Sequence, residues 1–301
     1  MKKITALLLV AVLFQASAQD DSQLTLERIF TNNEFQSDWF GYSRWIDGGE
    51  GYTTLEKSAE FAEYNEIVRY ETLSGKKEVI VSASAIIPLG EENPIRIHNY
   101  EWSKDKSKLL IYTNSKRVWR QNTRGDYWVL ELKSGKLRKL GGNEAKPSTL
   151  MFAKFSPDGN RVGYVREHDI YVEHISDGVI TALTTNGSNE MINGTFDWVY
   201  EEEFGCQDGF RWSPDGTKIA YWQLDAFGLG VFNLINNTDS IYSKIIPIQY
   251  PKVGEQNSSC RVGVVGSAGG STTWMKVEGD PVIHEITISL ECSGLLTQQI
   301  L

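Results

Sequence analysis

Three consecutive glutamates are the strongest chemical feature of this sequence. They lie in the segment 197–204, whose sequence is DWVYEEEF. Neighbouring carboxylates repel one another, so such a run needs either full hydration or a compensating cation. One interpretation is an exposed helical turn in a loop, with hydrated glutamates. The other is a receptor for an ammonium group, whose three donors suit paired carboxylates through charge-assisted hydrogen bonds.

Other catalytic patterns are incomplete. A serine nucleophile of the α/β-hydrolase type needs a Gly-x-Ser-x-Gly elbow, and the sequence of residues 266–269, GSAG, lacks that spacing. His284-Glu285 begins a zinc-protease pattern, but Ile288 stands where the second histidine is required. The glycines of residues 263–270 lack the Lys-Ser/Thr of a phosphate loop. The sequence therefore predicts no catalytic centre and no cofactor.

The three cysteines, Cys206, Cys260 and Cys292, lie far apart and without the Cys/His spacing that zinc requires. We therefore predict no metal site. One disulfide with one remaining thiol and three separate thiols are both compatible with the sequence.

The overall charge argues against nucleic-acid binding. The chain has 301 residues, with 30 lysines and arginines against 39 aspartates and glutamates, a net charge of -9. A phosphate-binding surface needs a basic excess, which is missing here. The hydrophobic content of 41% and charged content of 23% are typical of a globular chain.

The first 18 residues have the pattern of an export signal. Lys2 and Lys3 precede an apolar run over residues 4–14, and residues 16–18, ASA, form a small-residue cleavage site. The run is too short to span a bilayer as a helix, and no later segment reaches that length. We therefore predict cleavage after Ala18, a periplasmic or secreted location, and no stable membrane span.

An internal repeat indicates the fold. The sequence FSPDG at residues 155–159 and WSPDG at 212–216 each precede a short β-branched and aromatic run, and WSKD at 102–105 is a weaker copy. In each full copy an aromatic residue ends one strand and Pro-Asp-Gly forms a tight turn before the next. The aromatic positions lie 53 and 57 residues apart, the length of one four-stranded propeller blade with some loop insertion. The alternative is a set of unrelated hairpins in a sandwich.

Further strand patterns fit the blade interpretation. Residues 127–132 form one strand candidate, and residues 169–173 with 178–183 resemble the outer hairpin of a blade. Long periodic helical segments are absent apart from the signal. We interpret residues 19–301 as one incomplete propeller domain of about four blades.

Several motifs in order carry a family resemblance. The acidic segment 197–203 is followed by the turn at 212–216, while residues 118–120, VWR, precede Asp126-Tyr127. Residues 168–172, HDIYV, and 248–254, IQYPKVG, also fit, although the family strand more often opens with asparagine than with His168. Together these motifs resemble dipeptidyl peptidase IV, a branch of the prolyl oligopeptidase family of serine peptidases, over about residues 23–280.

The resemblance implies an eight-bladed all-β propeller packed on a C-terminal α/β-hydrolase domain. This chain would hold about half of that ring without the hydrolase domain, and would be inactive alone. The family removes dipeptides from peptide N-termini, preferring proline or alanine second. By motif position, Glu202 and Glu203 would bind the substrate's N-terminal ammonium, Arg120 would hold a peptide carbonyl oxygen, and Glu201 would support the turn. The resemblance also implies a homodimer.

Two other hypotheses remain open. The chain is a periplasmic propeller that only binds proteins or peptides, or it is a non-functional remnant of a broken gene. A Gly-x-Ser-x-Gly elbow in frame beyond residue 301 would favour the peptidase. A half ring also leaves an apolar blade face uncovered, so we expect this chain alone to be marginally soluble.

Overall fold

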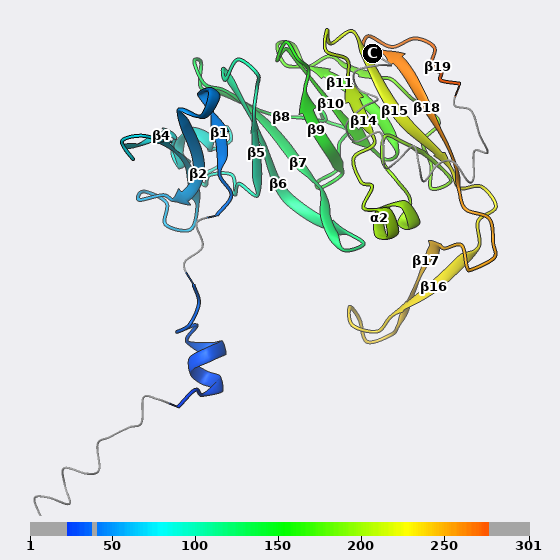
Figure 1. Ribbon diagram of the computed structural model, residues 1–301, viewed down its shortest axis with the longest axis horizontal. Coiled ribbons are helices and arrows are strands. Elements are labelled where there is room, and N and C mark those ends of the chain that lie inside the picture. The colour runs from blue at the N-terminus through cyan, green and yellow to red at the C-terminus, as the bar shows by residue number, and fades with distance from the viewer. Residues whose placement is uncertain (1–22, 38–40, 277–301) are drawn as a thin grey trace, which may run out of the picture. The chain divides into compact units, whose positions relative to one another are not determined.

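A computed structural model describes residues 23–37 and 41–276 of the chain (Figure 1). The predicted signal peptide at 1–18, together with His284 and Cys292, lies outside the described residues. The chain divides into two compact units, residues 1–55 with 70–76 and residues 56–69 with 77–301. The predicted site residues all belong to the second unit.

The first unit contains short elements. They are the π-helix η2 (Glu27–Thr31), strand β1 (Arg44–Ile46), the 3-10 helix η3 (Asp47–Gly49) and most of strand β2 (Gly51–Lys57). Strand β1 pairs antiparallel with β2, so that Ile46 lies opposite Gly51. Strands β3 (Asn65–Glu71) and β4 (Lys77–Val81) follow along the chain, and β4 belongs to the second unit.

The second unit consists mainly of antiparallel strands that pair with their neighbours in sequence. After η4 (Ala83–Ile86), one group contains β5 (Asn99–Trp102), β6 (Lys108–Val118), β7 (Gln121–Glu131) and β8 (Lys136–Lys139). The next contains β9 (Leu150–Phe155), β10 (Arg161–Arg166), β11 (Asp169–His174) and β12 (Ile180–Ala182). A short β7–β9 pairing joins the two groups.

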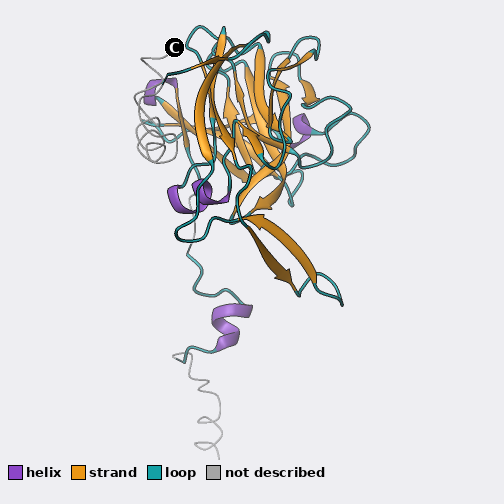
Figure 2. Ribbon diagram, turned by 90° about the vertical axis from the view of Figure 1, so that its right-hand side faces the viewer, coloured by secondary structure: helices purple, strands orange, loops and turns teal. Residues whose placement is uncertain are grey.

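A third sheet and a separate hairpin complete the described chain. The sheet contains β13 (Met191–Asn193), β14 (Phe210–Trp212), β15 (Lys218–Asp225), β18 (Ser259–Gly266) and β19 (Thr273–Trp274). The hairpin consists of β16 (Val231–Asn236) and β17 (Lys244–Gln249), which pair with each other. Figure 2 shows it extending away from the third sheet.

The repeated turns have the predicted structure. Trp102, Phe155 and Trp212 are the last residues of β5, β9 and β14. The glycines of the two full copies adopt positive φ angles, +67° at Gly159 and +71° at Gly216, which only glycine tolerates readily. The local sequence therefore sets each strand-turn-strand unit.

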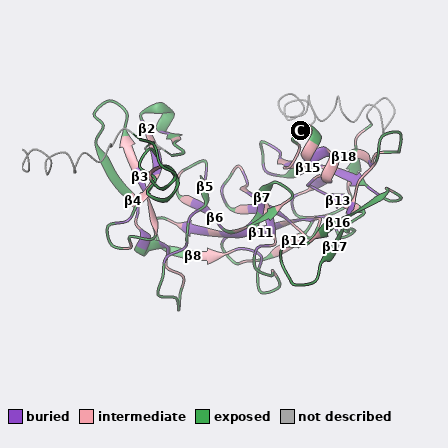
Figure 3. Ribbon diagram, turned by 90° about the horizontal axis from the view of Figure 1, so that it is seen from below, coloured by how far each residue is buried: buried purple, intermediate pink, exposed green. Residues whose placement is uncertain are grey.

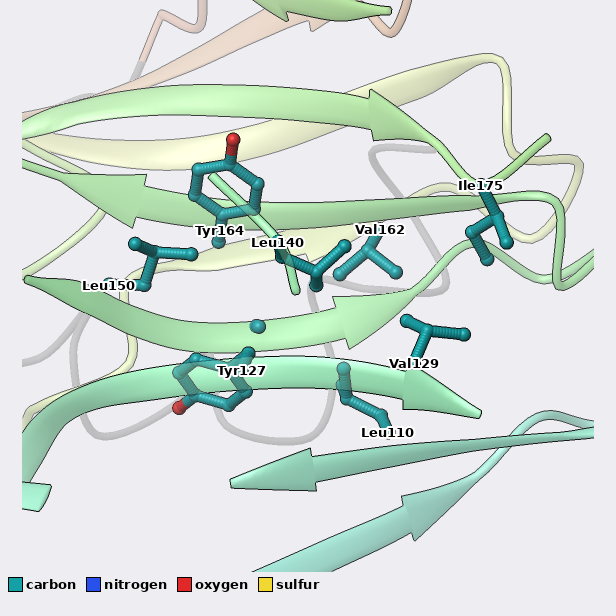
Figure 4. Close-up of a cluster of buried hydrophobic side chains, with 9 residues drawn as sticks. Leu110, Tyr127, Val129, Leu140, Leu150, Val162, Tyr164 and Ile175 are labelled. Carbon is teal, nitrogen blue, oxygen red and sulfur yellow. The ribbon is translucent and has the colours of Figure 1, made fainter. Parts of the chain in front are cut away.

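The core lies between successive strand groups. One buried cluster joins β6, β7, β9 and β10, and contains Leu110, Tyr127, Val129, Leu140, Leu150, Ala153, Val162, Tyr164 and Ile175 (Figure 4). A second joins β10 and β11 to β14, β15 and β18, with Phe210 and Ile219 fully buried. Burying each large apolar side chain contributes about 1.5–3 kcal/mol, so this face-to-face packing holds the groups together.

The predicted fold class is confirmed. The described chain is mostly strands, its sheets are not closed on themselves, and its helices are short (Figure 2). The predicted outer hairpin is present, since Tyr171 of β11 pairs with Ala182 of β12. None of the helices in the described ranges is long and apolar enough to cross a membrane.

Candidate functional site

The three glutamates lie on a short helix, α2 (Trp198–Phe204), with a residue suited to each end. Asp197 is the N-cap, and its side-chain oxygen accepts a hydrogen bond from the Tyr200 backbone N–H at 3.1 Å. Gly205 ends the helix in the left-handed conformation, with φ of +67°. The position of the helix along the chain is therefore encoded locally.

A buried hydrogen bond fixes the start of the helix. The Ser258 hydroxyl donates to the second carboxylate oxygen of Asp197 at 2.6 Å, and both side chains are buried. Burial raises the pKa of Asp197, and its hydrogen bonds from Ser258 and from backbone amides oppose that rise. Asp197 thus ties α2 to the segment that enters β18.

Apolar contacts hold α2 against the third sheet. Tyr200 is buried in a cluster with Ile192 of β13 and Leu224 of β15. Phe204, Cys206 and Cys260 pack against the same cluster, so two of the three cysteines border the helix. This anchoring determines which side chains of α2 point inward and which point outward.

The glutamates occupy three different environments. Glu201 is only 8% exposed, the Glu202 side chain is 6% exposed, and Glu203 is exposed. Burial, followed by the neighbouring charge of Glu202, raises the pKa of Glu201 to about 7. Its Oε1 atom has no hydrogen-bond partner among the described residues. The interpretation of an exposed turn with hydrated glutamates therefore fits Glu203 but not Glu201 or Glu202.

Arg120 reaches this helix from a hairpin turn. Val118 of β6 pairs with Gln121 of β7, which leaves Trp119 and Arg120 as a two-residue loop, and Trp119 adopts a positive φ of +44°. The Arg120 side chain is 80% exposed, and its Nε atom forms an ion pair with Oε2 of Glu202. The structure thus brings together two predicted site residues that are 82 positions apart in the sequence.

The resulting site is acidic with one cation at its edge. Arg120 neutralises Glu202, while Glu203 makes no ion pair with any described residue. The arginine has further N–H donors beyond the one on Glu202, so it can bind a carbonyl oxygen at the same time. The arrangement suits a ligand that carries a positive group next to a hydrogen-bond acceptor.

A pocket of about 400 Å³ beside α2 was not predicted from the sequence. It is lined by Glu201 and Trp198 of the helix, by Trp119, by His168 and by the end of the hairpin at residues 247–249, among others. Arg120, Glu202 and Glu203 do not line it. No linear motif signals such a pocket, because its walls come from separate segments. Within residues 23–37 and 41–276, no group of three or more His, Cys, Asp or Glu side chains is arranged to hold a metal ion.

The described strands form part of a β-propeller, and the acidic helix α2 packs on its third sheet. The sequence pattern of the family described as the dipeptidyl peptidase IV (DPP IV) N-terminal region matches residues 103–289. The chain belongs to this family.

Similar proteins include dipeptidyl aminopeptidase B of Saccharomyces cerevisiae, which is 31% identical over 67% of this chain and 24% of its own length. Prolyl endopeptidase FAP of Homo sapiens is 27% identical over 87% of this chain and 33% of its own length. The crystal structure of Porphyromonas gingivalis dipeptidyl peptidase 4 superimposes with a TM-score of 0.75 at 28% identity, covering 87% of this chain and 36% of that one. The chain therefore spans about a quarter to a third of the length of these relatives.

Proposed function

We propose that this chain forms the substrate-gating region of an exported serine dipeptidyl peptidase. In this proposal Glu202 and Glu203 bind the N-terminal ammonium of a peptide, and Arg120 binds a nearby peptide carbonyl oxygen. Family membership supports the peptidase assignment. The N-terminal sequence supports export, with signal cleavage after Ala18.

The ion pair between Arg120 and Glu202 is the observation that carries the proposal. It brings a guanidinium to one nearly buried carboxylate, and the exposed Glu203 is the next residue along α2. A peptide N-terminus offers the complementary groups, an ammonium and a carbonyl separated by one carbon. Because these groups would be fixed at one depth, only the first two residues would extend towards a nucleophile, so the glutamates would measure length and would not transfer protons.

Calorimetric titration of the chain with the tripeptide Ala-Pro-Ala and with its N-acetylated form tests the proposal. We expect the free amine to bind at least about tenfold more tightly, which corresponds to about 1.4 kcal/mol. Glu203→Gln removes an exposed charge without disturbing packing, so its loss of affinity for the free amine would not reflect unfolding. Glu91→Gln changes an exposed glutamate outside the site and should leave the affinity unchanged.

Two outcomes would overturn the proposal. The first is equal affinity of the free and acetylated tripeptides for wild-type protein. The second is a preference for the free amine that survives in both Glu202→Gln and Glu203→Gln, since the ammonium would then bind elsewhere.

We further propose that the exported protein is a homodimer, as the resemblance implies. The β16–β17 hairpin supports this proposal because, among the described strands, β16 and β17 pair only with each other. Most of their residues are exposed (Figure 3), and several of these are apolar. These are Val231, Phe232, Leu234, Ile235, Ile245 and Ile246. An apolar surface of this kind is suited to a protein contact.

A further inference from the structure

The pocket beside α2 is separate from the proposed amine site and has the size of a small-molecule site. Its volume of about 400 Å³ lies within the range of about 300–1,000 Å³ that is usual for such sites. Its walls come from the β6–β7 turn, the β10–β11 turn, the segment before α2, the helix itself and strand β17. All of these belong to the second unit.

The walls are largely aromatic and aliphatic. Trp119, Phe196 and Trp198 contribute rings from different segments, and Ile192 and Ile248 are only 4% and 6% exposed. The Trp198 ring packs against Tyr250 with ring centroids 4.6 Å apart, which fixes its orientation. Flat aromatic walls favour a planar apolar ligand.

The lining residue Glu201 has one carboxyl oxygen without a partner among the described residues. Glu201 is more than nine-tenths buried, and its Oε1 atom accepts no hydrogen bond from any described residue. By contrast, the neighbouring carboxylate of Asp197 accepts from Ser258 and from the Tyr200 amide. A buried acceptor without a partner costs about 1–3 kcal/mol, which a ligand donor would recover.

The pocket lining carries no excess of positive charge. The exposed side chains of Arg124 and Glu190 carry opposite charges, and the Asp197 carboxylate already accepts a hydrogen bond from Ser258. Burial lowers the pKa of His168, which favours its neutral form. The pocket therefore offers no net attraction for an anion, and its hydrogen-bonding need is for a single donor.

We propose that this pocket binds a neutral, planar aromatic molecule that directs one N–H or O–H group to the carboxyl of Glu201. The proposal rests on the pocket and on Glu201, and it does not depend on the amine-binding role of Glu202 and Glu203. The ligand would occupy the side of α2 that carries Glu201, next to the site proposed for the peptide N-terminus.

Indole and N-methylindole are matched probes, because only indole has the N–H donor while both have the same aromatic body. We expect saturation-transfer NMR titrations of the chain to show indole binding at least about tenfold more tightly than N-methylindole. Glu201→Leu should remove this difference, whereas Glu201→Gln keeps a side-chain carbonyl acceptor and should retain it. Because the probes are compared on wild-type protein, the result does not depend on a variant folding.

A competition experiment separates this site from the amine site. A saturating concentration of Ala-Pro-Ala should leave indole bound, because the tripeptide binds through its ammonium at the amine site and indole, which has no ammonium, binds in the pocket. Displacement of indole by the tripeptide would show that the two share one site and would overturn the proposal. Equal affinity of the two probes, or no indole binding at millimolar concentration, would also overturn it, whatever the outcome of the tripeptide titrations.

Discussion

The turn aspartates and Glu201 are carboxylates whose pKa values move in opposite directions. Asp105 and Asp215 lie in exposed turns. Each carboxylate accepts hydrogen bonds from the serine two residues before it and from the residue two positions after it, and these bonds lower its pKa to about 2. Glu201 lies on α2, where burial and the charge of Glu202 raise its pKa to about 7. The turns supply donors to their carboxylates, while the helix supplies none to Oε1 of Glu201.

The difference separates two uses of an acidic residue. In the turns, the serine, the aspartate and the amide that follows form a closed local set, which stabilises the strand connection. On α2, one oxygen of the buried Glu201 carboxyl has no partner among the described residues, which costs stability and is typical of a functional region. Substitutions of Glu201, of the turn residues and, for contrast, of exposed hairpin residues test this comparison.

Glu201→Gln should have the largest effect, because it removes the unpaired buried acid. A pKa of about 7 in the folded chain, above the ordinary 4.5, means that the folded state holds its proton more tightly than the unfolded state does. Wild-type stability should therefore fall as pH rises from about 4.5 to about 7, by on the order of 2 kcal/mol. Urea unfolding of wild type and variant from pH 4 to pH 8 measures how steeply the free energy of unfolding falls with pH. This fall should be smaller in the variant. Parallel stability curves would contradict the assignment.

Ser213→Ala should destabilise the second full turn by about 1–2 kcal/mol. The buried Ser213 hydroxyl donates to Asp215 at 2.6 Å and accepts from the Lys218 amide at 2.9 Å, so its removal leaves both without that partner. Ser134→Ala, in an exposed turn, is the matched control and should change stability by less than about 0.5 kcal/mol. If Ser213→Ala and Ser134→Ala lower the free energy of urea unfolding equally, the buried hydroxyl contributes no more stability than the exposed one.

Asp215→Asn should have a smaller effect, which is present above about pH 4 and disappears in acid. Because the folded-state pKa is about 2, below the ordinary 3.8, the carboxylate contributes stability above about pH 4 that is lost as the pH falls towards 2. The variant should show a flatter acid limb in thermal unfolding between pH 4 and pH 2. Asp105→Asn should behave in the same way, since its turn has the same hydrogen bonds. If both variants lose stability in acid as steeply as wild type does, the turn aspartates do not contribute to the pH dependence of stability.

Thr substitutions in the hairpin should have the smallest effect on stability. Ile235 and Ile245 are opposite each other across β16 and β17 and are 65% and 66% exposed. Replacing both with threonine keeps β-branched side chains, so the free energy of unfolding should change by less than about 0.5 kcal/mol per site. Self-association measured by sedimentation velocity should weaken at the same time. Unchanged association would exclude this pair from the proposed dimer contact.

The sequence by itself determined the features that depend on neighbouring residues. The repeated turns, the strand ends at Trp102, Phe155 and Trp212, and the outer hairpin follow from short-range chemistry. Motif order also placed Arg120, Glu202 and Glu203 in one candidate site, although it predicted no ion pair among them. The cysteine pairing stayed open because cysteine spacing alone does not determine it.

Only the tertiary structure decided that Glu203 alone of the three glutamates is exposed, that Glu202 meets Arg120, and that a pocket lies beside the helix. These features depend on how Tyr200 packs α2 against β13 and β15, and on a hairpin turn from β6 and β7 reaching the same helix. Consecutive helical residues point about 100° apart, so three identical side chains in the sequence acquire different environments once one face is docked. Burial and partnership are set by contacts between distant segments, and a linear pattern of residue types does not contain those contacts.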